Sequence, residues 1–139
     1  MRGPIPVLLA VIFAVACVPS RGQFRLEYPG RELVDPVAVT ITDRTGLIAG
    51  VAVAPPDIPG REGAVTAKPG EPAGLIVTWV GGMCDQTTEL VFERTATGFR
   101  FVEHTERADA CLLAAIGRSL AIRLSTPIAP ETVEFVAAL

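Results

Sequence analysis

Residues 87–104 read TTELVFERTATGFRFVEH, and this stretch is the clearest indication of the fold class. Apolar and polar side chains alternate along residues 87–95 and again along residues 98–104. A period of two is typical of a strand with one buried face, and a short segment containing Gly98 joins the two halves. The stretch therefore predicts a β-hairpin, in whose turn we expect Gly98 to adopt a positive φ.

Further segments with the composition of short strands lie on both sides of this hairpin, separated by turn residues. They are residues 24–28, 36–42, 47–54, 75–80, 120–124 and 132–136. Seven or eight short strands with frequent turns are typical of an antiparallel β-sandwich or a barrel-like domain. The sequence therefore predicts a mostly β fold. Residues 109–117 allow one short helix near 110–116, with Asp109 and Gly117 as its caps.

Three segments before the hairpin carry predictions of their own. Residues 43–46 (DRTG) have the composition of a tight turn, so we expect residues 36–42 and 47–54 to pair as a hairpin. Residues 47–54 are apolar on both faces, which predicts burial on both sides. Residues 55–73 are rich in Pro and Gly, which predicts a long loop that either carries a recognition site or acts as a spacer.

The size and charge of the chain limit the classes of protein that it can represent. Its 139 residues leave room for one domain, which we place at residues 24–139. The formal net charge is −3, and no basic stretch occurs. Nucleic-acid binding needs clustered Lys and Arg side chains, so the sequence excludes nucleic acid as a partner.

The N-terminal residues have the organisation of an export signal. Arg2 precedes an apolar run from residue 5 to residue 16, and polar residues follow directly after Cys17. The run has the length of a signal-peptide core and is short for a membrane-spanning helix, which needs about 20 residues. We expect residues 1–16 to be a signal peptide and residues 17–23 to be a linker.

The sequence Ala14-Val15-Ala16-Cys17 ends this apolar run and resembles a bacterial lipobox. The resemblance implies a lipoprotein of the cell envelope, cleaved before Cys17 and anchored to a membrane through a lipid on that cysteine. It departs from the family's pattern at Ala14, where the family prefers Leu. Two alternatives stay open: a secreted domain cleaved at the small residues Ala14 and Ala16, and an uncleaved anchor.

The other two cysteines, Cys84 and Cys111, have two interpretations. Lipidation of Cys17 would leave them as a pair, and exported proteins fold in an oxidising environment, so we expect a disulfide between them. A copper-binding protein of the envelope is the alternative, because thiolate, thioether and imidazole from these cysteines, Met83 and His104 suit Cu(I).

No catalytic motif stands out in the remaining sequence. His104 could act as a base for Cys84 only if that thiol were free, and we expect a solvated histidine instead. We interpret four carboxylates of the hairpin region as an ordinary solvated face and not as an acid–base pair: Glu89, Glu93, Glu103 and Glu106. We expect Trp79 to lie in the core, although an exposed binding platform is the alternative.

The sequence as a whole predicts a non-catalytic binding or structural module without a cofactor. Its expected partners are a membrane, through the lipid anchor, and an envelope protein that the sequence does not identify. A secreted β domain and a copper-binding protein are the alternatives.

Overall fold

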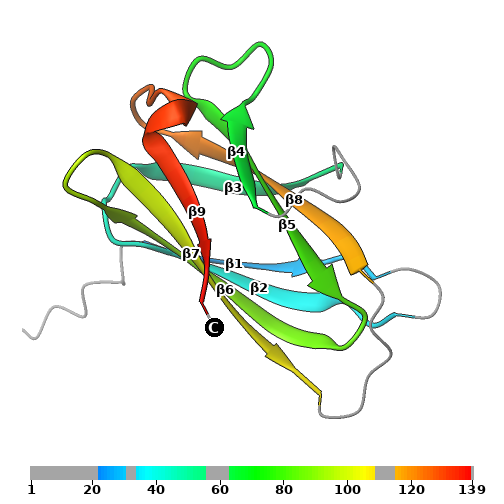
Figure 1. Ribbon diagram of the computed structural model, residues 1–139. Helices are drawn as coiled ribbons and strands as arrows, with labels where there is room; N and C mark the ends of the chain where they lie inside the picture. Colours follow the sequence, from blue (N-terminus) through cyan, green and yellow to red (C-terminus); the bar gives the residue numbers. More distant parts are fainter. Residues whose placement is uncertain (1–21, 31–33, 56–62, 109–114, 139) are drawn as a thin grey trace, which may run out of the picture.

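The computed structural model describes residues 22–30, 34–55, 63–108 and 115–138. These residues form nine strands and one 3-10 turn, η1. Their bounds are β1 (Gln23–Tyr28), β2 (Val37–Asp43), β3 (Ile48–Ala54), β4 (Ala64–Ala67), β5 (Gly74–Gly82), β6 (Asp85–Arg94), β7 (Phe99–Arg107), β8 (Ala115–Leu124), η1 (Pro130–Thr132) and β9 (Val133–Ala137). The prediction of a mostly β fold is confirmed (Figure 1).

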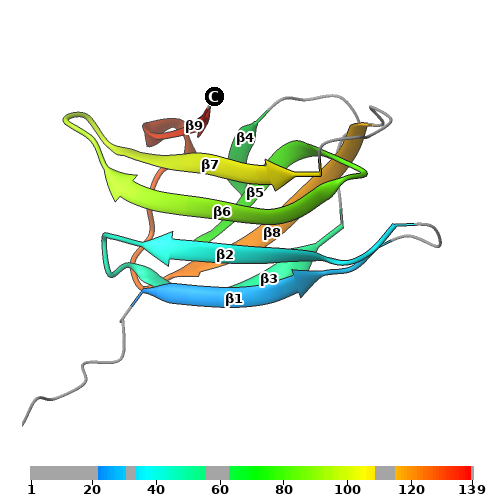
Figure 2. The same cartoon turned by 90° about the horizontal axis from the view of Figure 1, so that it is seen from below.

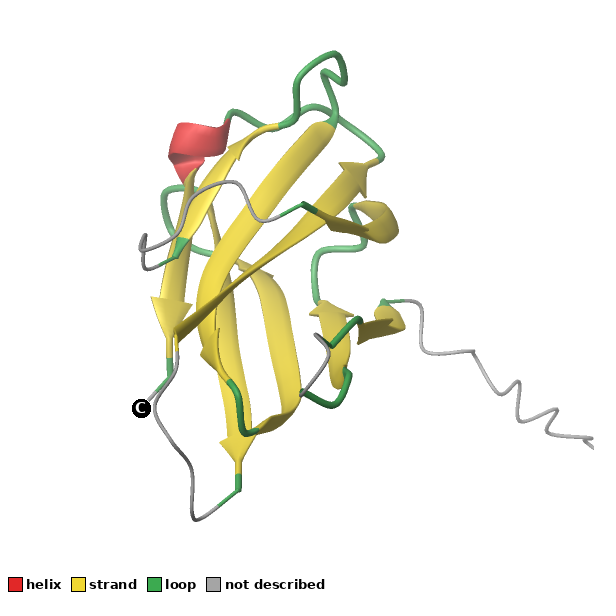
Figure 3. Ribbon diagram, turned by 90° about the vertical axis from the view of Figure 1, so that its right-hand side faces the viewer, coloured by secondary structure: helices red, strands yellow, loops and turns green. Residues whose placement is uncertain are grey.

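The strands form two sheets, which lie face to face as the layers of a sandwich. One sheet has the order β1-β2-β6-β7-β9, and the other has the order β3-β8-β5-β4. Figure 2 shows the first sheet in front of the second, and Figure 3 shows the short η1 turn at one end of the layers. The two sheets have no strand in common, so the described part of the chain is a sandwich and not a closed barrel.

The hairpin predicted from residues 87–104 is present as β6 and β7. The two strands pair antiparallel, with Phe92 opposite Phe101. The turn is closed by a hydrogen bond from the backbone N–H of Thr95 to the carbonyl of Gly98 and by one from the N–H of Gly98 to the hydroxyl of Thr95. The φ of Gly98 is not positive, so that expectation was wrong. A side chain at Gly98 would instead overlap the backbone of Thr132. The close approach of these two backbone segments therefore favours glycine at this position.

The turn at residues 43–46 is also present, but it does not close a hairpin. The carboxylate of Asp43 accepts hydrogen bonds from the backbone N–H groups of Thr45, Gly46 and Ile48 at 2.8–3.1 Å. Gly46 has a φ of 73°, which favours glycine. β2 and β3 then enter different sheets, so the turn is a corner between the layers and the predicted pairing was wrong.

Two strand pairs are parallel, whereas we expected an antiparallel fold throughout. β2 pairs in parallel with β6, and β7 pairs in parallel with β9. Parallel neighbours need a long connection that crosses to the other layer, and no local turn signal marks such a pair. The five-stranded sheet is therefore mixed, while the four-stranded sheet is antiparallel.

Three further expectations differ from the structure, and they concern strands β3, β4 and β8. β3 is an edge strand on which Val53 is 41% exposed, so the strand is not buried on both faces. Within the predicted loop 55–73, Ala64–Ala67 forms β4 against β5, while residues 56–62 lie outside the described residues. β8 begins at Ala115 and contains Gly117, so Gly117 does not cap a helix; residues 109–114 are also outside the described part.

The core lies between the sheets and takes its side chains from both. Trp79 is fully buried there, so its interpretation as a core residue is confirmed. Phe92 and Phe101 stack at 4.5 Å between ring centroids. The other core residues of least exposure are Val39, Ile41, Leu75, Val77, Leu90, Leu120 and Ile122. Each such side chain contributes about 1.5–3 kcal/mol when it leaves water.

Candidate functional site

The cysteines of the sequence-based site predictions lie at the margins of the described structure. Cys17 and Cys111 fall in residues 1–21 and 109–114, outside the described residues. Cys84 is half-buried between β5 and β6 and is not a free thiol. The signal peptide, the lipid on Cys17 and the bond between Cys84 and Cys111 therefore stay predictions. Within the described ranges, no helix has the length and apolar character needed to cross a membrane.

The residues that we considered for copper do not come together in the described structure. His104 is exposed on β7 opposite Glu89, whereas Met83 and Cys84 precede Asp85 at the start of β6. Four residues of strand separate Asp85 from Glu89, which is about 13 Å. Among the residues that the structure describes, no group of three or more His, Cys, Asp or Glu side chains is placed to hold a metal ion.

The carboxylates of the hairpin separate into two environments. Glu89, Glu93 and Glu106 lie on the outer face of the five-stranded sheet, as expected for a solvated face. Glu93 makes ion pairs with Arg100 at 2.6 Å and Arg44 at 3.1 Å. The hydrogen bond from Arg100 is the main cause that lowers the pKa of Glu93. These contacts stabilise a surface and do not form a pair of acid and base.

Glu103 was grouped with those surface residues, and that interpretation was wrong. It points inward from β7, on the same face as Phe101, and is 7% exposed. Its carboxylate accepts a hydrogen bond from the hydroxyl of Thr105 at 2.9 Å. Burial is the largest cause that raises the pKa of Glu103, and the nearby Asp85 raises it further. Arg107 and Arg118 act in the opposite direction.

A buried ion pair lies beside Glu103, between the two sheets. The side chains of Asp85 and Arg118 are 0% and 2% exposed, and Arg118 Nη1 donates to Asp85 Oδ2 at 2.5 Å. Asp85 also accepts from the backbone N–H of Gly82 at 2.7 Å and from Arg107 Nε at 2.9 Å. Two guanidinium groups thus share one carboxylate. These contacts offset the free-energy cost of burying the charges of Asp85 and Arg118.

The glycines that follow the segment 75–80 make room for this ion pair. A side chain at Gly81 would overlap the guanidinium of Arg118 and the carboxylate of Asp85. The carbonyl of Gly82 accepts a hydrogen bond from Arg118 Nη2 at 3.1 Å. Both glycines belong to β5, which therefore extends two residues beyond the predicted segment 75–80.

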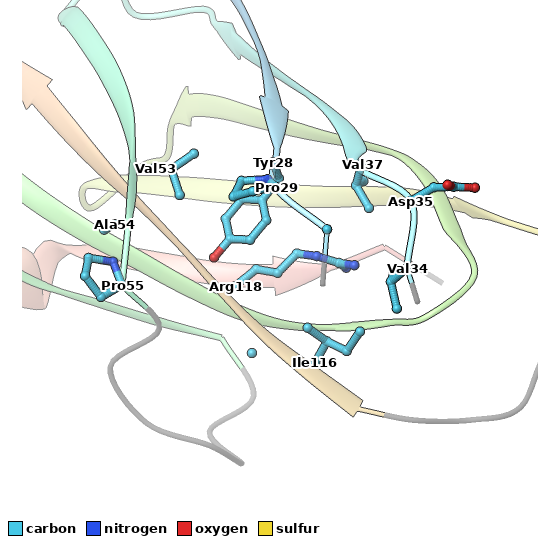
Figure 4. A pocket seen from close by; sticks show the side chains of 12 residues that line it. Tyr28, Pro29, Val34, Asp35, Val37, Val53, Ala54, Pro55, Ile116 and Arg118 are labelled. Atoms are coloured by element: carbon cyan, nitrogen blue, oxygen red, sulfur yellow. The ribbon is translucent and has the colours of Figure 1, made fainter. Parts of the chain in front are cut away.

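A pocket of about 440 Å³ opens between the sheets above Arg118. It is lined by residues from 28–30, 34–37, 53–55 and 116–118, at the ends of four strands. Figure 4 shows Val53, Pro55 and Ile116 around its wall, with Arg118 at the base beneath Tyr28. Its volume is within the range of pockets that bind small molecules, and apolar walls with few polar groups are typical of such sites.

Tyr28 joins the pocket to the core. Its ring makes an edge-to-face contact with Trp79 at 6.1 Å, and Arg118 lies 5.9 Å from the ring centre. Its hydroxyl oxygen accepts a hydrogen bond from the backbone N–H of Ser119 at 3.1 Å. Among the described residues, no acceptor binds the proton of this hydroxyl, so the group has a donor to offer.

Sequence reasoning missed the residues that form this site. Arg118 is in register with Leu120, Ile122 and Leu124, so the period of two already placed it on the inward face of β8. The predicted strand 120–124 began two residues after Arg118, so the prediction did not include this residue. Asp85 carries no comparable signal, because its burial depends on its distant partner Arg118.

Comparison with known proteins adds no relative to this description. No family model, no curated protein and no solved structure matches the chain. The fold and the site therefore define a β-sandwich with a pocket between its sheets, and any statement on its function depends on the site itself.

Proposed function

We propose that this chain is a non-catalytic binding module of the bacterial cell envelope, which holds a small ligand with an apolar body in the pocket between its sheets. The pocket is the observation that carries the proposal. As the described residues form it, the pocket lies at the end of the sandwich, its walls are mainly apolar, and it exposes Val53, a large hydrophobic residue. Exposed apolar side chains in a concave site favour ligand binding.

The proposed location of the module in the cell envelope depends on the N-terminal sequence. Cleavage before Cys17 and a diacylglycerol group on its sulfur would hold the domain at the membrane surface, with residues 17–23 as the linker. The proposal includes a disulfide between Cys84 and Cys111. A bridge that closes a loop of this length adds about 3–4 kcal/mol to the free energy of unfolding. A secreted form without lipid is the alternative, whereas nothing in the described geometry favours the copper-binding protein.

Intact mass of the protein from its native membrane fraction tests the anchor and the disulfide together. We expect a chain that begins at Cys17 and carries a diacylglycerol group. Two thiols should react with an alkylating reagent only after reduction. A mass without lipid would mean that Cys17 carries no lipid anchor and that the protein is either secreted or held by an uncleaved leader. Thiols that react before reduction would exclude the disulfide and reopen copper binding.

Ligand binding is tested with a substitution that fills the pocket without entering the core. We expect Val53→Glu to weaken binding at least about tenfold, because the longer charged side chain occupies the apolar wall. The probes are 1-octanol and octanoate, added to the mature protein as isolated. Binding is followed by the NMR shift of the Ile116 methyl group, which faces the same pocket.

Val136→Glu is the matched control for this test. Val136 is 40% exposed against 41% for Val53, and it also lies on an edge strand, β9, away from the pocket. We expect this variant to bind both probes like the natural protein. If neither probe shifts the Ile116 methyl group, or if both variants bind equally, the pocket is not a ligand site and the proposal is wrong.

A further inference from the structure

We infer that the ligand of the pocket is an amphipathic carboxylate, with its carboxylate group toward Tyr28 and Arg118 and its hydrocarbon body against Val53 and Ile116. The inference rests on the proposed function and names the chemical class of the ligand. Four observations support it: the charge beneath the pocket, the free hydroxyl proton, the orientation of Asp35 and the apolar wall.

Among the described residues, positive charge is in excess beneath the pocket when Glu103 is protonated. Arg107 and Arg118 share the carboxylate of Asp85, and Glu103 is in electrostatic contact with all three groups. Burial and the carboxylate of Asp85 raise the pKa of Glu103, so it releases its proton less readily than an ordinary glutamate. An anion in the pocket would lie next to the buried guanidinium of Arg118, which lines the pocket, whereas Arg107 is partly exposed to solvent.

The polar groups at the base of the pocket donate hydrogen bonds, which suits an oxygen of a ligand. The hydroxyl of Tyr28 has already accepted the N–H of Ser119, and its own proton meets no acceptor among the described residues. Arg118 carries only donors. A ligand that ends in an ammonium group would place a donor against donors and a positive charge beside a guanidinium.

The single carboxylate that lines the pocket does not oppose this assignment. Asp35 lies at the rim and is exposed, and Figure 4 shows its carboxylate directed away from the base of the pocket. The remaining wall around Val53, Pro55 and Ile116 offers no charge. A hydrocarbon body is the group that gains most from contact with such a surface.

The protonation of Glu103 then makes binding of the anion depend on pH. Below the raised pKa, Glu103 is neutral and the excess positive charge attracts the carboxylate of the ligand. Above it, the ionised Glu103 adds a negative charge to the cluster and repels the ligand. The affinity for a carboxylate therefore falls as pH rises, whereas the affinity for a neutral ligand does not change.

The test compares pairs of probes that differ only in the head group. The pairs are octanoate with 1-octanol, and 3-phenylpropanoate with 3-phenylpropan-1-ol. Dissociation constants are measured at pH 5.5 and pH 8 from the Val53 and Ile116 methyl shifts of the mature protein. We expect the carboxylates to bind about tenfold more tightly than their alcohols at pH 5.5. Their affinity should be lower at pH 8, by a factor that depends on how far the pKa of Glu103 is raised, while that of the alcohols stays constant.

Glu103→Gln isolates the titrating group without removing the buried shape of the side chain. In this variant we expect carboxylates to bind equally well at both pH values, at least as tightly as they bind the natural protein at pH 5.5. Alcohols that bind as well as the carboxylates would overturn the inference and leave the proposed function intact. If no probe of either kind binds, both the inference and the proposed function are wrong.

Discussion

Replacing Arg118 with Met is expected to lower the free energy of unfolding by about 3–5 kcal/mol. The substitution leaves the fully buried carboxylate of Asp85 without its closest cation. Arg107 also contacts this carboxylate, but its side chain is 54% exposed and does not occupy the buried position of Arg118. Chemical denaturation, followed by circular dichroism with the disulfide state unchanged, measures the loss. Adding Asp85→Asn should recover part of it, because the amide removes the charge and can still accept the N–H of Gly82.

Arg123→Met is the control for this prediction. Arg123 lies on the same strand, β8, but its side chain is exposed, so we expect a change within about 0.5 kcal/mol. A loss below about 1 kcal/mol for Arg118→Met would mean that the pair behaves like a surface ion pair. The central charged group of the site would then contribute little to the fold.

Replacing Phe92 with Ala should also cost about 3–5 kcal/mol, for a different reason. Phe92 is fully buried and stacks on two rings, Phe101 at 4.5 Å and Phe99 at 5.5 Å between centroids. Its loss opens a cavity between the sheets and removes both ring contacts. The free energy of unfolding is measured as for Arg118.

Phe24→Ala provides the comparison for Phe92. Phe24 lies on the edge strand β1 and is only partly buried, so less than half of the loss is expected. Equal losses for the two variants would show that the stacked rings do not form the centre of the core.

The period of two predicted where the strands lie because that signal is local. It placed Val37, Val39 and Ile41 on one face, and all three are buried. It could not show which strands are neighbours, because pairing partners are distant in sequence. The turn at residues 43–46 therefore suggested a hairpin although it connects two layers, and the parallel partner of β2 left no mark in the sequence.

The candidate site was missed because charged residues are usually exposed. Arg118 and Glu103 both occur at inward positions of their strands. Glu103 was nevertheless assigned to a solvated face because of its charge, and Arg118 lay outside the predicted strand 120–124. Their burial is tolerated because Asp85 and Thr105 provide partners. These partners are brought together only when β6, β7 and β8 have taken their places in the two sheets.

The parallel pair of β2 and β6 has a consequence for the order of events in folding. β1 and β2 are neighbours in the chain and can pair early, whereas the partner of Ala38 on the other side of β2 is Thr87. Until β6 pairs with it, β2 presents an unpaired edge to other molecules. Such distant pairing is slow compared with closing a local hairpin. The pairing of β6 with β2 therefore removes this unpaired edge of β2 and leaves β1 and β9 as the edge strands of the five-stranded sheet.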